Sequence, residues 1–502
     1  MGDLGNPDVR QGAAGADDAH RTRGGAGAFP RRPGGRRVRL LKAPMTTRAP
    51  DALAPLTGDE AQHVLSEALA MSSAAEDATA ILESRVQALT RFANNEIHQN
   101  VASRQQALTV RVVIGRRCGV ASTSRLDSSA LRQVADRALA LARLTPEDDE
   151  LPPPAPAAMV APLERFAAAT AACTPEERAQ AVGPVMQAAA AAGLNAAGAL
   201  STESICLALA TRGGRFAYHP ETYAHFTCTV RSDDSSGWGD RHRRDWRELE
   251  AAPLGATAIR KAEQSRVPVA IEPGAYTVVL EPSAVAELVA FLAWLGLGAQ
   301  SEQEGRSFLS GRMGQRITGE SITLVDDATD PRGFGRPFDY EGTPRRRVTL
   351  IERGVARGVV HDRRTAARAG VESTGHACAP PAVEGPLPYD LVLGTGDATI
   401  EEMIGSTERG ILVTRFWYNR VVDARRTIVT GMTRDGTFLI EGGRITRGLR
   451  NLRFNENVLD VLARADAIGR HAEPTVFDYA GNCVIVPALR TRDFRFTGVA
   501  PF

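Results

Sequence analysis

The side chains best suited to metal binding or nucleophilic catalysis gather in a short segment near residue 370. His361, His376 and Cys378 lie 15 and 2 residues apart, and Asp362 follows the first histidine. Imidazole and thiolate groups are ligands that zinc favours, and a thiol beside an imidazole is also the pair that cysteine catalysis needs. Random placement readily produces such groupings, so a loop thiol near a surface imidazole is the simpler interpretation of this segment.

Two clusters of basic and aromatic residues are more distinctive. RFWYNR at 415–420 is typical of a strand, which would place Arg415, Trp417 and Asn419 on one face and Tyr418 on the other. TGMTRDGTFLIEGGRI at 430–445 predicts a hairpin in which RDG forms the first turn, with Arg434 at that turn, and GG forms the second. Ordinary sheet and turn structure also explains both clusters, so they leave the function open.

Several common catalytic motifs are absent from the sequence. It contains no GxxxxGK[ST] phosphate loop, no GxSxG turn and no HExxH helix. The nucleoside triphosphatase, serine hydrolase and common zinc peptidase signatures are therefore missing.

The elements that would position these residues fall into two regions, and the first of them contains a Pro-rich linker, LPPPAPAAMVAP at 151–162. In the first region, 46–265, apolar periodicity predicts helices over 58–71, 128–144 and 175–192, with Thr57 and Thr174 as caps. Strands are predicted over 77–100, 107–122, 197–210 and 214–231, with hairpin turns near Gly115 and Gly213.

The second region, 266–502, is richer in strands and turns. Its clearest strands are predicted at 276–280, 347–351, 391–393, 410–422, 427–430 and 437–440. One helix, Ser283 to about Leu297, is apolar almost all round, which predicts burial. The fold class expected is α+β, with an N-terminal α/β region followed by a β-rich C-terminal domain.

Composition bounds the class of protein. The 502 residues are 43% hydrophobic and 24% charged, which is typical of a globular chain of two large units.

Residues 1–45 hold nine basic and four acidic side chains, which predicts a disordered Arg/Gly-rich tail, with Met45 as an alternative start. The net charge of +1 thus leaves −4 for residues 46–502, which argues against nucleic-acid binding. Six scattered cysteines without a CxxC pair, and the lack of a signal peptide or membrane helix, predict a cytoplasmic protein.

Several segments together resemble the TldD/PmbA family of metallopeptidases. The N-terminal hallmark is resembled by ESRVQALTRFANNEIHQNV at 83–101. The C-terminal domain is resembled by VVHDRRTAARAGVESTGHA at 359–377, GDATIEEMI at 396–404, TRFWYNRVVD at 414–423, MTRDGTFLIEGGRI from 432 and NLRFNENVLDVL at 451–462. The resemblance extends from about residue 57 to 498.

The resemblance implies a heteromeric protease in which one subunit, TldD, carries an HExxxH zinc motif on a helix. Two histidines and a cysteine farther along hold the metal, while the glutamate activates water. In this sequence the corresponding positions are Ala286, Glu287 and Phe291, so the glutamate is kept and both histidines are lost. Arg415 lies in a strand where a thiol ligand would be needed. No metal is therefore expected in this chain, and the resemblance is to the PmbA (TldE) branch.

By this resemblance, the chain pairs with a TldD-like zinc-bearing homologue, and the heteromer cleaves small or unfolded peptides. An extended peptide would add along exposed strand edges. Substrate contacts are expected from Arg415, Tyr418 and Arg434, and from Arg91 and His98 in the N-terminal hallmark. The main alternative is a stand-alone peptide-binding module without peptidase activity. A third is an enzyme with a metal at His361, His376 and Cys378.

Overall fold

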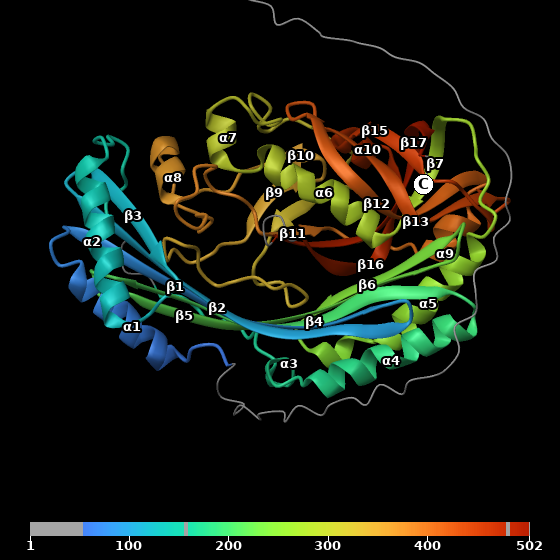
Figure 1. Cartoon of the computed structure of the whole chain (residues 1–502). Helices are drawn as coiled ribbons and strands as arrows, with labels where there is room; N and C mark the ends of the chain where they lie inside the picture. The colour runs from blue at the N-terminus through green and yellow to red at the C-terminus, as the bar shows by residue number, and fades with distance from the viewer. Residues whose placement is uncertain (1–53, 155–158, 478–481, 501–502) are drawn as a thin grey trace, which may run out of the picture. The chain divides into compact units, whose positions relative to one another are not determined.

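The computed structural model describes residues 54–154, 159–477 and 482–500, which all belong to one compact unit. The tail expected over residues 1–45 lies outside the described residues, as does part of the linker at 151–162. Within the described part, the strands form a six-stranded sheet and an eleven-stranded sheet, and helices pack against both. This mixture, with a sheet-rich C-terminal half, confirms the α+β class (Figure 1).

The first sheet is antiparallel throughout, in the order β3-β2-β1-β4-β5-β6. Its strands are β1 (Asp77–Ala93), β2 (Glu96–Ile114), β3 (Arg117–Thr123), β4 (Asn195–Thr211), β5 (Phe216–Arg231) and β6 (Ser236–Arg243). The hairpins predicted near Gly115 and Gly213 are confirmed. Long strands of alternating character give this sheet one apolar face and one polar face.

The apolar face is covered by four helices, two at each end of the sheet (Figure 1). These helices are α1 (Gly58–Met71), α2 (Ser128–Leu144), α4 (Pro175–Ala191) and α5 (Ala251–Gln264). The short α3 (Ala168–Ala171) and η2 (Trp246–Leu249) lie in the connections between the longer elements. Leu82, Leu108 and Leu131 are fully buried between the sheet and α1 and α2, while Phe92 and Phe226 stack under α4 and α5.

The predicted helix starts are confirmed by capping boxes. At α4, Thr174 Oγ1 accepts a hydrogen bond from the Glu177 N–H at 3.2 Å, and Glu177 Oε2 accepts one from the Thr174 N–H at 2.8 Å. Thr57 and Glu60 make the same pair at α1. Each box satisfies two N–H groups that a helix terminus otherwise leaves unpaired.

Replacing Thr174 by alanine is expected to lower the free energy of unfolding by about 1 kcal/mol, because the helix loses its side-chain acceptor at N3. Urea unfolding followed by circular dichroism measures this change. Thr174→Ser keeps the hydroxyl and is expected to cost only a few tenths of that amount. Equal losses in the two variants would show that the methyl group, and not the cap, matters.

The second sheet combines parallel and antiparallel pairs around the core of the C-terminal half. Its strands are β7 (Gly274–Leu280), β8 (Leu324–Asp326), β9 (Val348–Glu352), β10 (Val355–Ala356), β11 (Asp390–Leu393), β12 (Arg409–Asp423), β13 (Ile428–Glu441), β14 (Arg444–Gly448), β15 (Leu452–Asn457), β16 (Ala465–Phe477) and β17 (Asn482–Val499). The accompanying helices are α6 (Pro282–Gly296), α7 (Ala299–Gln303), α8 (Arg363–Ala369), α9 (Ile400–Gly405) and α10 (Val458–Ala463).

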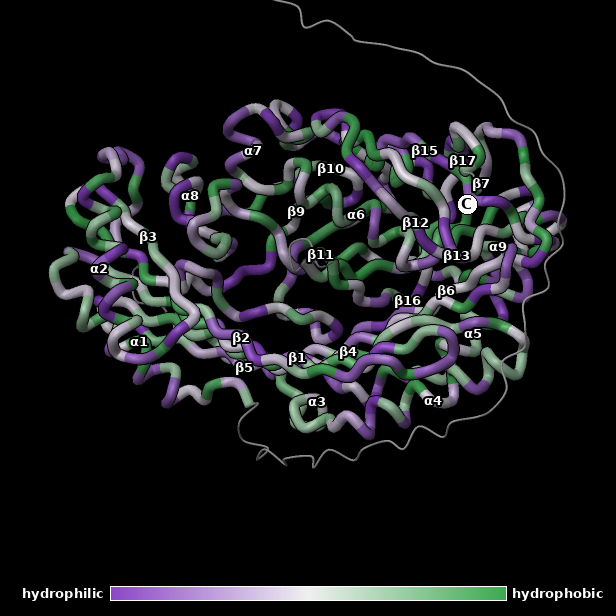
Figure 2. The backbone as a smooth tube through the Cα atoms, viewed as in Figure 1, coloured by the Kyte–Doolittle hydropathy of each residue, from purple (hydrophilic) through white to green (hydrophobic). Residues whose placement is uncertain are grey.

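Helix α6 is the centre of this core, as its apolar sequence predicts. Ala284, Val285, Leu288 and Leu292 are buried against strands of the second sheet, and Figure 2 shows hydrophobic residues gathered along α6 and its neighbours. No helix in the described ranges is long and apolar enough to cross a bilayer.

The prediction that RDG at 434–436 turns a hairpin is wrong. Strand β13 runs through this segment without reversing. The chain turns instead at Gly442 and Gly443, where the sequence predicts the second turn. Asp435 and Gly436 have φ angles of 53° and 126°, and the pairing with β12 shifts nearby. The turn-forming residues therefore make a bulge inside a long strand, a conformation that Asp and Gly also allow.

Candidate functional site

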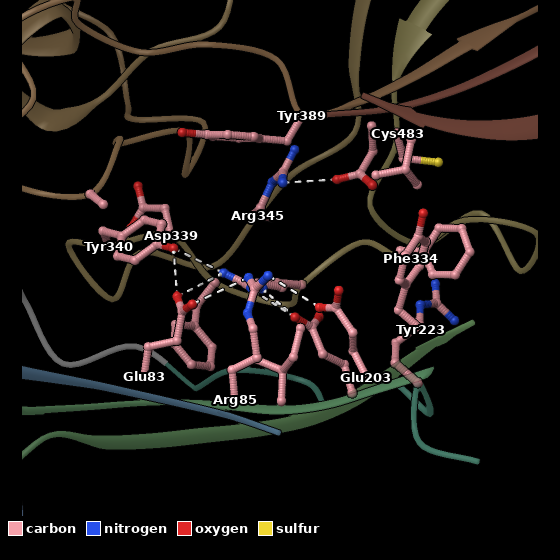
Figure 3. A pocket seen from close by; sticks show the side chains of 18 of the residues that line it. Glu83, Arg85, Glu203, Tyr223, Phe334, Asp339, Tyr340, Arg345, Tyr389 and Cys483 are labelled. Carbon is pink, nitrogen blue, oxygen red and sulfur yellow. Dashed lines mark hydrogen bonds and ion pairs between the residues drawn. The ribbon is translucent and has the colours of Figure 1, made fainter. Parts of the chain in front are cut away.

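The polar face of the first sheet is turned toward the C-terminal half and lines a cavity. The cavity has a volume of about 410 Å³ and is closed on the other side by loops of the C-terminal half. Figure 3 shows Glu83, Arg85 and Glu203 rising from the sheet, with Arg345 and Tyr389 on the opposite wall. Strand alternation explains this arrangement, because these sheet residues face away from the covering helices.

The floor of the cavity is charged but internally paired. Arg85 donates to Glu203 at 3.1 Å, and Arg336, from a loop of the C-terminal half, donates through Nε to Glu221 at 3.0 Å. Burial acts to raise the pKa of Glu221, but Arg336 outweighs it and holds this pKa below its ordinary value. The guanidinium and carboxylate groups of this floor therefore form a surface of paired charges.

The opposite wall contains a buried ion-pair network. Arg345 donates to Asp326 at 2.6 Å and to Asp390 at 2.9 Å, and the side chain of each is at most 5% exposed. His376 Nε2 lies 2.7 Å from Asp326 Oδ1. Burial raises the pKa of Asp390 to about 6, opposed by the Arg345 charge and assisted by the Asp326 charge. This network fixes the loops that close the cavity.

A second group of polar residues lies where β6 meets β12 and β13. The Arg415 guanidinium stacks on Trp238 of β6, with 4.5 Å from its central carbon to the ring centroid, and on Trp417 at 5.1 Å. Arg415 Nε also donates to Asp435 Oδ2 at 3.1 Å. One cation therefore ties the first sheet to the second, with one cation–π contact to a tryptophan of each sheet.

Glu287 lies beside this group, buried within α6. The Asn419 amide of β12 donates to its carboxylate. Burial raises the pKa of Glu287 to about 8, opposed by the Arg415 charge and the Asn419 hydrogen bond and assisted by the Asp240 charge. Glu287 is therefore protonated at neutral pH in the folded chain.

Two of the three predicted C-terminal contact residues come together. Arg415 and Arg434 are cross-strand partners, and Arg434 lies 5.2 Å from the Trp417 ring and 3.7 Å from Asp435. Tyr418 instead projects from a bulge in β12, with φ at 57° and 63% exposure, and Arg420 stacks on its ring. The role of all three in binding substrate stays a prediction.

The two predicted N-terminal residues lie elsewhere on the first sheet. Arg91 is exposed on β1 and shares its face with Arg85, about 20 Å farther along the strand. His98 is exposed on β2, beside the irregular pairing near Arg91. Neither has a contact that links it to Arg415, and their part in binding substrate stays a prediction.

The residues at the expected zinc position do not fit a metal. Ala286 is fully buried and Phe291 packs against the core, so neither offers a ligand atom beside Glu287. The alternative group also does not form: His376 is held by Asp326, and the Cys378 thiol donates to the Gly385 carbonyl at 3.1 Å. Burial raises the pKa of Cys378, which keeps it a thiol and disfavours it as a nucleophile.

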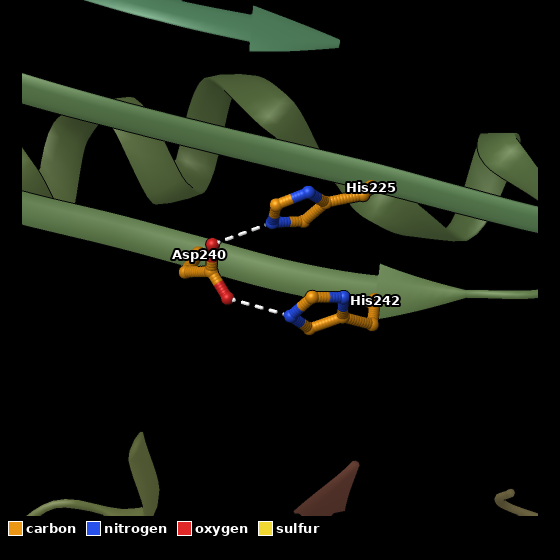
Figure 4. Close-up of side chains that lie close together, drawn as sticks. All are labelled: His225, Asp240 and His242. Carbon is orange, nitrogen blue, oxygen red and sulfur yellow. Dashed lines mark hydrogen bonds and ion pairs between the residues drawn. The ribbon is translucent and has the colours of Figure 1, made fainter. Parts of the chain in front are cut away.

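The structure instead brings together three residues that the sequence analysis missed, His225, Asp240 and His242 (Figure 4). They lie on β5 and β6, on the same polar face as the cavity floor. The only sequence signal was the alternation of Asp240 and His242, which places both on one face of a strand. Whether His225 lies close to these two residues depends on the register between β5 and β6, which places His225 directly opposite His242.

Comparison with known proteins agrees with this fold. A family model described as the PmbA/TldA metallopeptidase C-terminal domain matches residues 273–498, and one described as domain 1 of the same family matches residues 78–142. Together they cover more than half of the chain. A crystal structure of TldE from Thermococcus kodakarensis superposes with a TM-score of 0.79 at 19% identity, covering 87% of this chain and 99% of that one.

Several curated relatives carry the name metalloprotease. A metalloprotease of Methanocaldococcus jannaschii is 27% identical over 216 residues, which are 42% of this chain and 46% of that protein. A metalloprotease TldD homologue of Haemophilus influenzae is 25% identical over 252 residues, which are 48% and 52%. The chain thus spans about half the length of the curated relatives it matches. On the family models and the shared fold, this chain belongs to the PmbA/TldD metallopeptidase family.

Proposed function

We propose that this chain is a TldE-like subunit, without the HExxxH zinc motif, that pairs with a TldD-like zinc subunit for the proteolysis of small unfolded peptides in the cytoplasm. The observation that carries the proposal is the environment of Glu287. The family fold is kept around α6, but Ala286 and Phe291 supply no ligand and Asn419 binds the glutamate. A protonated glutamate without zinc cannot activate water as a general base.

An open edge of β2 supports the proposed association with a TldD-like subunit. Residues 96–107 of β2 pair with β1 on one side, and β3 pairs only from Leu108 onward. In the described part of the chain no strand covers the other side of this stretch, and Ile97 and Val101 are 38% and 45% exposed. An exposed, partly apolar strand edge is a surface that another chain can extend by backbone hydrogen bonds.

The charged cavity supports the substrate class. Its floor and wall carry both guanidinium and carboxylate groups, and its volume of about 410 Å³ admits a short peptide segment but not a folded domain.

The proposal is tested by mixing this chain with a purified TldD-like homologue that carries HExxxH. Cleavage of an unstructured fluorogenic peptide is expected only in the mixture, and the two chains are expected to co-elute in size-exclusion chromatography. A homologue with its motif glutamate replaced by glutamine serves as the control and should abolish cleavage.

Other outcomes separate the alternatives. Cleavage by this chain alone would overturn the proposal. Peptide binding by this chain, with cleavage by the homologue unaffected by its addition, would instead support a stand-alone peptide-binding module.

A further inference from the structure

We propose that His225, Asp240 and His242 form a binding site for one divalent first-row transition ion, of which zinc is the probe. This site shares no ligand with the α6 position at which the family resemblance implies zinc, and it does not depend on the proposed pairing with a homologue. It adds a metal to a chain that the sequence predicts to hold none.

The three ligand atoms converge in the structure. His225 Nε2 lies 2.6 Å from Asp240 Oδ1, and His242 Nε2 lies 2.9 Å from Asp240 Oδ2. All three ligand atoms lie within 4.8 Å of one another. Two imidazole nitrogens and a carboxylate oxygen form a donor set that zinc accepts in three-ligand sites with an open fourth position. A bound ion needs ligand atoms only about 3.3 Å apart, so small side-chain shifts suffice.

The backbone holds this convergence in place. His225 and His242 are direct partners across β5 and β6, and their rings stack with centroids 4.1 Å apart and planes 6° from parallel. Asp240 lies two residues from His242 on the same face, where its side chain reaches both rings. Gly237 and Gly239 bring the opposite face of β6 against α5, which leaves the strand little freedom to move.

Tyr223 completes the arrangement. Its hydroxyl lies 2.5 Å from His242 Nδ1, and its ring meets Phe334 edge-on with centroids 5.3 Å apart. Metal-bound histidines donate their other ring N–H to an outer acceptor, and the Tyr223 hydroxyl oxygen can accept from Nδ1–H once an ion replaces the Nε2 proton. In the ion-free chain Asp240 accepts from the two Nε2 atoms, and an ion would take the place of those protons.

The position of the site gives a bound ion access to a ligand. Tyr223 also lines the cavity, so the site lies at one end of the same polar face as Arg85 and Glu203. His225 is 27% exposed through its side chain, whereas His242 and Asp240 are 4% and 8% exposed. The partial exposure of His225 leaves one side of the cluster accessible, as an open fourth coordination position requires, while the other two ligands are buried.

The test is isothermal titration of zinc chloride into the full chain after dialysis against a chelator, with cobalt absorption in the visible as a second readout of coordination. One ion per chain is expected. His225→Gln and Asp240→Asn should each weaken binding at least about tenfold and reduce the cobalt bands, and Tyr223→Phe should weaken it about 10- to 100-fold.

His63→Gln on α1 is the matched control, because His63 is an exposed histidine outside the cluster, and it should leave binding unchanged. Circular dichroism confirms that each variant is folded. No saturable zinc binding by the folded parent chain would overturn the proposal, and so would binding that His225→Gln and Asp240→Asn leave unchanged.

Discussion

Replacing Arg345 by methionine is expected to lower the free energy of unfolding by about 3–5 kcal/mol, the cost of leaving buried carboxylates without their cation. Arg345 is bound by Asp326 and Asp390, and all three side chains are nearly inaccessible. Methionine fills the space of the arginine stem but supplies neither charge nor donor. Urea unfolding of the full chain measures the change.

The neighbouring residue provides the matched control. Arg346 pairs with Glu372 at 2.6 Å, but both side chains are more than half exposed. Arg346→Met should therefore cost less than about 1 kcal/mol, since an exposed pair is screened by water. Losses of similar size in the two variants would contradict the role assigned to the buried network.

Acidification gives a second readout of the same variant. Without Arg345, Asp390 loses its cation and Asp326 keeps His376 as its side-chain partner, so the pKa of each carboxyl group rises in the folded state. Protonating the two carboxyl groups removes the cost of burying their charges. The difference in the free energy of unfolding between Arg345→Met and the parent chain should therefore shrink as the pH falls toward 5. A difference that stays constant with pH would show that lost packing, and not charge, is responsible.

The sequence predicts local structure in this chain well, for physical reasons. Helix α4 begins where Thr174 and Pro175 stand before Glu177, and α6 is buried because it has almost no polar face. These features depend on residues within one turn of each other. RDG misled the prediction because the same residues serve a turn and a bulge, and only pairing with β12 decides between them.

The candidate site was predictable only in part. Arg415 and Arg434 belong to neighbouring segments, so a correct strand pairing would bring them together, and the family resemblance located Glu287. Arg345 meets Asp390 across 45 residues, and the histidine cluster requires the exact register of β5 and β6. Long-range register follows from packing of the whole sheet, so no local pattern in one sequence reveals it.

Replacing Glu287 by glutamine is expected to stabilise the chain at pH 8–9 and to leave its stability nearly unchanged at pH 5. Burial raises the pKa of Glu287 to about 8, whereas the unfolded chain has the ordinary value near 4.5. The folded state thus binds a proton that the unfolded state has already lost between these two values. Its stability therefore falls as the pH rises through this window, by up to about 5 kcal/mol.

Glutamine removes that dependence because it is neutral at every pH, while its amide oxygen still accepts from Asn419. Urea unfolding at pH 5, 7 and 8.5, in the presence of a chelator, isolates the effect as the difference between variant and parent chain. Glu263→Gln is the matched control, since Glu263 is exposed on α5 and should give the same small difference at each pH. If Glu287→Gln changes stability equally at all three pH values, Glu287 is ionised in the folded chain, and the argument that it cannot serve as a base loses its foundation.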